Sequence, residues 1–102
     1  LVDTFPFLQE DLRLCSADQD VFTFDAADGE TIDALITFTH ALGDIDMDLY
    51  DAALDLVDTS DSETDDELIS YLVQAGEGGT YYLVVYGIGA ATNTYDLLID
   101  VD

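Results

Sequence analysis

The sequence predicts an all-β domain, a two-sheet antiparallel β-sandwich of about eight strands with a jelly-roll-like arrangement. Apolar and polar side chains alternate along most of the chain, which is the period of a β-strand. Turn signals separate the alternating runs at roughly 8–12-residue spacing. Helical spacing is weak, and residues 48–57, its best example, are better interpreted as a hairpin. One antiparallel sheet cannot cover both of its faces, so two sheets packed face to face are expected.

The expected strands follow the alternation in chain order. The pair Asp28-Gly29 marks a turn, and residues 60–65 and 76–79 mark a polar loop and a glycine-rich turn. Strands 31–40 and 80–86 carry apolar residues on both faces and are expected at the sheet centres. The complete set is 12–15, 20–25, 31–40, 44–51, 56–59, 67–74, 80–86 and 94–101.

The run from Gly43 to Tyr50 has an aspartate at every second position with an apolar residue between. Along a strand, these aspartates lie on one face and the apolar side chains on the other. The apolar set (Ile45, Met47, Leu49) is expected in the core. The acidic side chains, Asp46, Asp48, Asp96 and Asp100 among them, are expected to face solvent, and every acid of the chain is expected to be solvated.

The same run could be taken for an EF-hand calcium loop, because its aspartates match the first ligand positions. Leu49 stands where that loop needs glycine, and Asp55 replaces its bidentate glutamate. Flanking helices are also not predicted. The EF-hand interpretation is therefore rejected, while another calcium site at Asp18 and Asp20 or in the loop 61–66 stays open.

The length of the chain limits the number of domains, and its charge limits the partners that it can bind. The 102 residues suffice for one domain spanning 1–102, with residues 1–11 expected to form a linker or N-terminal extension. The chain begins at Leu1 and not at methionine, which suggests a domain cut from a longer polypeptide. The formal net charge is −23, with Arg13 as the one basic residue besides a single histidine. Nucleic acid and anionic membranes are excluded as partners, since both are bound through lysine and arginine.

The sequence offers little for catalysis, and the protein is expected not to be an enzyme. His40 and Cys15 are the single histidine and cysteine, too few for a zinc site. The segment Gly87-Ile88-Gly89 lacks the third glycine and the helix of a dinucleotide fingerprint. The many carboxylates show no pair in contrasting environments, as glycosidases require.

Four segments in order carry a family resemblance that covers nearly the whole chain. They are residues 14–24, 43–51, 79–87 and 93–99. Together they resemble the bacterial pre-peptidase C-terminal domain family. The resemblance implies a compact, non-catalytic β-sandwich appended to a secreted bacterial enzyme, most often a peptidase. It implies a role in secretion, maturation or attachment to a substrate or surface, with the parent enzyme as partner and a secreted or cell-surface location.

The alternative function is a calcium-stabilised binding module for an insoluble protein or polysaccharide. The related collagen-binding domains of clostridial collagenases are stabilised by calcium, and Asp18 and Asp20 match one part of their ligand set. Their N-terminal ligand segment has only a short counterpart here, around Glu10 and Asp11. No cofactor is expected to be required, and calcium is the one candidate ion.

The tyrosines favour a binding role if they form an exposed platform. Most lie on predicted central strands and are expected to be core or half-buried, and Tyr50 and Tyr71 are undetermined. The central set is Tyr81, Tyr82, Tyr86 and Tyr95.

Overall fold

The computed structural model describes residues 6–14, 19–38, 45–60, 66–87 and 93–102. Eight strands occupy these residues, in a chain order close to the expected one. Their bounds are β1 Phe7–Leu14, β2 Gln19–Ala26, β3 Thr31–Phe38, β4 Ile45–Tyr50, β5 Leu56–Ser60, β6 Asp66–Leu72, β7 Gly79–Gly87 and β8 Asn93–Val101. No helix in the described part of the chain is long and apolar enough to cross a membrane.

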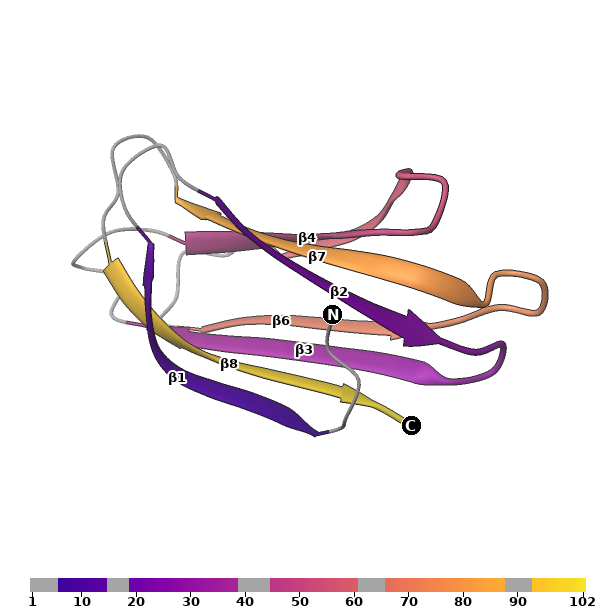
Figure 1. Cartoon of the computed structure of the whole chain (residues 1–102), viewed down its shortest axis with the longest axis horizontal. Helices are drawn as coiled ribbons and strands as arrows, with labels where there is room; N and C mark the ends of the chain where they lie inside the picture. The colour runs from indigo at the N-terminus through magenta and orange to yellow at the C-terminus, as the bar shows by residue number, and fades with distance from the viewer. Residues whose placement is uncertain (1–5, 15–18, 39–44, 61–65, 88–92) are drawn as a thin grey trace.

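The strands form two four-stranded sheets that pack face to face (Figure 1). Their orders are β1-β8-β3-β6 and β2-β7-β4-β5, and every pairing is antiparallel. Successive strands alternate between the sheets for most of the chain, which is the jelly-roll arrangement. The prediction of a jelly-roll-like sandwich is confirmed, and β3 and β7 lie inside their sheets as expected.

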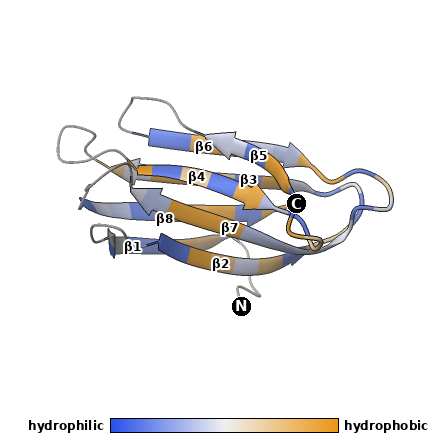
Figure 2. Ribbon diagram, turned by 90° about the horizontal axis from the view of Figure 1, so that it is seen from above, coloured by the Kyte–Doolittle hydropathy of each residue, from blue (hydrophilic) through white to orange (hydrophobic). Residues whose placement is uncertain are grey.

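The core lies between the sheets and consists mainly of every second residue of the strands, those at the sheet edges included. Figure 2 shows the alternation as changes of hydropathy along the ribbons. The acidic run is β4, and its apolar residues Ile45, Met47 and Leu49 are fully buried as predicted. The other buried members include Phe24, Ile32, Ile36, Ile69, Tyr81, Leu83, Tyr95, Leu97 and Ile99.

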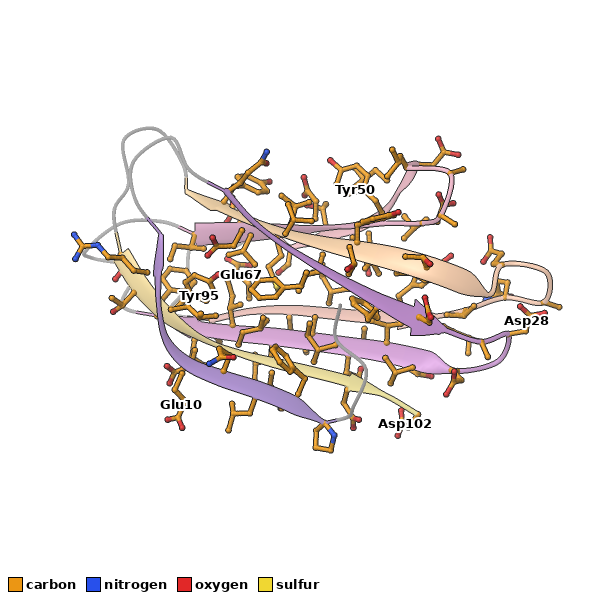
Figure 3. The ribbon with its side chains drawn as sticks, in the orientation of Figure 1. Glu10, Asp28, Tyr50, Glu67, Tyr95 and Asp102 are labelled. Carbon is orange, nitrogen blue, oxygen red and sulfur yellow. The ribbon has the colours of Figure 1, made fainter. Side chains whose placement is uncertain are left out.

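Two side-chain hydrogen bonds join the sheets near one end of the sandwich. The Tyr95 hydroxyl on β8 donates to the Asp20 carboxylate on β2. The Ser60 hydroxyl on β5 donates to the carboxylate of Glu67 on β6. Figure 3 places Tyr95 and Glu67 between the two layers. These bonds give polar partners to groups that the sandwich has removed from water.

At the opposite end, Asp28 connects two turns. Its carboxylate accepts hydrogen bonds from the backbone N–H groups of Gly76 at 2.8 Å and Gly78 at 2.6 Å. These bonds lower the pKa of Asp28, the bond from Gly76 more than the bond from Gly78, because they favour the ionised form. The Asp28-Gly29 turn predicted from sequence is thereby held against the glycine-rich turn between β6 and β7.

Two expectations are wrong. Residues 7–11, expected as part of a linker or N-terminal extension, belong to β1, an edge strand that pairs with β8. The register shifts between Gln9 and Leu12, and this irregularity breaks the alternation from which strands are predicted. The expectation that every acid is solvated also fails, because Asp46 is 4% exposed and Glu67 is 1% exposed.

Candidate functional site

The outer face of the β2-β7-β4-β5 sheet carries an open groove with a volume of about 720 Å³. It crosses the three strands β2, β7 and β4, which come from widely separated parts of the sequence (Figure 1). The residues that characterise its lining are Val21, Asp48, Tyr50, Leu54, Tyr82 and Tyr86.

Strand alternation places the tyrosines of this groove. On β7, Tyr81 points into the core, so Tyr82 and Tyr86 point outward and are half-buried. Tyr50 on β4 is the direct cross-strand partner of Tyr82, which brings the two side chains together on the outer face. Figure 3 shows Tyr50 on the side of its sheet that faces away from the core.

Asp48 is the polar centre of the groove. Its Oδ1 lies 2.6 Å from the Thr59 hydroxyl and 3.3 Å from the Tyr86 hydroxyl, and its Oδ2 lies 3.4 Å from the Tyr50 hydroxyl. Burial, helped by the negative charges of Asp48 and Asp46, raises the pKa of Tyr86 to about 12. The protonated Tyr86 hydroxyl donates to Asp48 Oδ1.

Leu54 closes the groove from the β4–β5 connection in an unusual backbone conformation. Its φ is +64°, and it is the one non-glycine residue with positive φ in the described ranges. Asp51 holds the turn, since its Oδ1 accepts from the N–H groups of Ala53 at 2.9 Å and Asp55 at 3.0 Å. The side chain of Leu54 is 65% exposed. Residues held in sparsely populated backbone conformations cluster at functional sites, so Leu54 is a candidate contact residue of the groove.

The groove has the chemistry of a binding surface. Aromatic faces and three aliphatic side chains, those of Val21, Leu54 and Val84, supply contact area, while one carboxylate and the tyrosine hydroxyls supply hydrogen bonds. The described residues contain no group of three or more histidine, cysteine, aspartate or glutamate side chains placed to hold a metal ion.

The described residues include some of the predicted site residues but not all of them. Asp20 bonds to Tyr95 through Oδ2, whereas Asp18, His40 and Cys15 lie outside the described residues. Most of the loop 61–66 also lies outside them. The calcium site proposed for Asp18 and Asp20 stays a prediction.

The tyrosines divide into two sets. Tyr81 and Tyr95 belong to the core, and Tyr71 packs against it. Tyr82 and Tyr86 are half-buried in the groove, as expected for central strands, and Tyr50 joins them. The groove itself was not predicted. Alternation identifies which tyrosines face outward. It does not give the order of the strands in the sheet, which places these tyrosines side by side.

Comparison with known proteins decides the family. The profile of the bacterial pre-peptidase C-terminal domain matches residues 18–87. The chain belongs to this family. Pre-peptidase C-terminal domains are small domains found in bacterial peptidases and related to collagen-binding modules. The predicted resemblance is thereby confirmed. No curated protein sequence matches the chain.

Solved structures share the fold of this pre-peptidase C-terminal domain. The corresponding domain of a Bacillus anthracis collagenase superposes with a TM-score of 0.75 at 20% identity, covering 93% of this chain and 89% of that one. PliG of Aeromonas hydrophila, a periplasmic inhibitor of g-type lysozyme, gives 0.73 at 12% identity, covering 100% and 92%. The Yersinia pseudotuberculosis-derived mitogen gives 0.71 at 12% identity, covering 96% and 88%. At these identities the likeness concerns the fold.

Proposed function

We propose that this domain is a non-catalytic accessory module that attaches a secreted bacterial peptidase to an insoluble protein or polysaccharide. The observation that carries the proposal is the tyrosine-lined groove on the β2-β7-β4-β5 sheet. Its location would be extracellular or on the cell surface, where such polymers are met.

The form of the groove supports attachment to a polymer. It is open along the sheet, so a long chain can lie across it without its ends being enclosed. Tyr50 and Tyr82 lie side by side as cross-strand partners and present aromatic surface at a low cost in side-chain entropy. Asp48 constrains the hydroxyls of Tyr50 and Tyr86, which pre-organises the surface before a ligand arrives.

The family supports a role within a larger enzyme. The matching profile is that of a domain of bacterial peptidases, and one structural neighbour is a domain of a collagenase. Collagen is therefore the first insoluble substrate to test, with cellulose and chitin as polysaccharides. Calcium-stabilised binding remains the alternative form of the same function, through the proposed ligands Asp18 and Asp20.

The test is retention of the purified domain on insoluble collagen, cellulose and chitin. We expect the wild type to be retained on at least one polymer. The double variant Tyr50→Ala, Tyr82→Ala should bind that polymer about tenfold more weakly, since buried aromatic anchors dominate such interfaces. Leu72→Ala is the matched control, because Leu72 is 52% exposed on the other sheet and should leave retention unchanged.

Three results would contradict the proposal. One is that none of the three polymers retains the wild type. Another is that the double tyrosine variant, shown by circular dichroism to be folded, binds as well as the wild type. Loss of retention in Leu72→Ala would contradict it as well, because the binding surface would then lie on the other sheet.

A further inference from the structure

The outer face of the second sheet, β1-β8-β3-β6, carries a continuous row of four leucines across all of its strands. Leu8 pairs with Leu98, Leu98 pairs with Leu35, and Leu35 pairs with Leu68. We call these residues the leucine row. Adjacent strands are about 4.8 Å apart, so the row is roughly 14 Å long.

The leucine row is accessible. Leu8 and Leu68, at its two ends, are each 60% exposed, and Leu35 and Leu98 are partly exposed between them. A shallow hollow of about 190 Å³ lies along β8, lined by Leu8, Leu35 and Leu98 among others. Apolar side chains that line up on one exposed face are a common mark of a protein-interaction surface.

Carboxylates border the leucine row on both sides. Two residues further along the strands in one direction, Asp33 pairs with Asp100. Two residues in the other direction, Asp66 and Asp96 both pair with Thr37. Two residues along a strand span about 7 Å, so each acidic border lies within reach of a partner's lysine or arginine.

Glu10 adds to the second border. It lines the same hollow as Asp96, and Figure 3 shows it pointing away from the opposite sheet. An apolar centre between two acidic borders thus occupies most of this face, and Arg13, which pairs with the exposed Thr94, lies beyond the second border.

The charges around the leucine row indicate which kind of partner this face can bind. A second copy of the chain would place carboxylate borders against carboxylate borders, and each copy carries a net charge of −23. An anionic lipid surface would be repelled in the same way. A protein segment with an apolar stripe between basic side chains matches both the centre and the borders.

We infer that the outer face of the β1-β8-β3-β6 sheet is a docking surface for a basic amphipathic protein segment. The segment contacts the leucine row with its apolar side chains and the acidic borders with lysine or arginine. An α-helix of about 10 residues has the length of the row, and its residues at i, i+3, i+4 and i+7 form such a stripe. The face is on the opposite side of the sandwich from the tyrosine groove, so both can be occupied together.

The test uses a fluorescent synthetic peptide of about 14 residues with leucine on one helical face and lysine on both flanks. Binding to the full chain is measured by anisotropy at roughly 0.15 M salt. We expect Leu8→Ser, Leu68→Ser to weaken binding at least tenfold, because the variant removes both exposed ends of the apolar contact. Leu56→Ser is the matched control, since Leu56 is 54% exposed on the other sheet and should leave the affinity unchanged.

Two further peptides separate the contributions. Replacing every lysine by glutamate should abolish binding, and replacing every leucine by serine should weaken it at least tenfold. Equal binding of the serine peptide would mean charge attraction alone and would overturn the inference. Wild-type affinity in the folded Leu8→Ser, Leu68→Ser variant would overturn it as well. So would a dimer, seen by light scattering, that Leu68→Ser dissociates, because a second copy would then be the occupant.

Discussion

At the scale of single residues, the backbone of Leu54 links stability to the proposed binding role. A leucine with φ of +64° is strained by its Cβ, whereas asparagine tolerates this conformation. We expect Leu54→Asn to raise the free energy of unfolding by about 0.5–1 kcal/mol, measured by urea denaturation. The same variant should lower retention on the polymer bound by the wild type, because Leu54 lines the groove.

A matched control is Leu56→Asn, two residues further on. Leu56 begins β5 and is similarly exposed, but its φ is not positive. Asparagine is disfavoured in strands, so this variant should be no more stable than the wild type. A Leu54→Asn protein that is less stable than the wild type would show that the leucine contributes packing that outweighs the strain.

At the scale of structural elements, the turn after β2 and the turn between β6 and β7 are in close contact through Asp28 and Gly78. A Cβ on Gly78 would lie 2.6 Å from Asp28 Oδ1 and 2.9 Å from the Asp28 backbone nitrogen. Both distances are too short, and the backbone atom cannot simply move aside. We expect Gly78→Ala to lower the free energy of unfolding by about 1–3 kcal/mol, as overpacking does elsewhere.

Thermal unfolding checks this expectation, with Ala75→Ser as the control. Ala75 is exposed in the same turn, so its small polar replacement should leave the melting temperature nearly unchanged. If Gly78→Ala melts at the wild-type temperature, the two turns are not held as closely as the Asp28 hydrogen bonds indicate.

The elements also show what the sequence could predict. The strands with strict alternation, β3 and β4 for example, were placed within a few residues, because one face of each must be buried. The first half of β1 was missed, since Gln9, Glu10 and Asp11 are consecutive polar residues beside a register shift. Its position comes from pairing with β8, which is a long-range contact.

Burial of charge was harder to predict than burial of apolar residues. Glu67 shares a face with Ile69, so alternation already placed its carboxylate inward. Asp46 faces outward as expected but lies opposite the bulky Tyr86, and a single-strand pattern does not contain this neighbour. The same limit applies to predicting the groove. Its tyrosines face outward by alternation, but they meet only because β4 and β7 are adjacent.

At the scale of the whole molecule, the raised pKa values of four buried or half-buried tyrosines predict alkaline unfolding. Burial raises the pKa of Tyr71 and of Tyr86 to about 12, and it also raises those of Tyr81 and Tyr95. In the unfolded chain these groups ionise near pH 10. Between about pH 10 and 12 the unfolded chain therefore binds fewer protons, and the free energy of unfolding falls as pH rises. Below about pH 10 this contribution is fully present.

Tyrosine absorbance at 295 nm and far-ultraviolet circular dichroism, followed together during a titration, check this expectation. Ionisation of these four tyrosines should coincide with loss of the strand signal. Tyr71→Phe removes one of the shifted groups and should make the fall of stability with pH shallower. Complete ionisation near pH 10 with an intact strand signal would contradict the raised pKa values of these hydroxyls in the folded domain.

The net charge of −23 predicts that salt stabilises the domain. The screening length is about 10 Å at 0.1 M salt and about 3 Å at 1 M, so repulsion among the carboxylates falls steeply over this range. We expect the melting temperature to rise continuously with sodium chloride. A melting temperature independent of salt would mean that the carboxylates are already neutralised by protons or bound cations.

Adding calcium tests whether the domain has a specific ion site in addition to this general screening by salt. If Asp18 and Asp20 bind the ion, millimolar calcium should raise the melting temperature beyond a sodium chloride control of equal ionic strength. Asp20→Asn should then remove the excess while leaving the response to sodium intact, since it changes one charge among many. Because the Asp20 carboxylate also accepts the Tyr95 hydroxyl, this variant is compared with Tyr95→Phe, which removes that hydrogen bond but keeps the carboxylate. Equal shifts in calcium and sodium would refute the calcium site and leave screening as the whole effect.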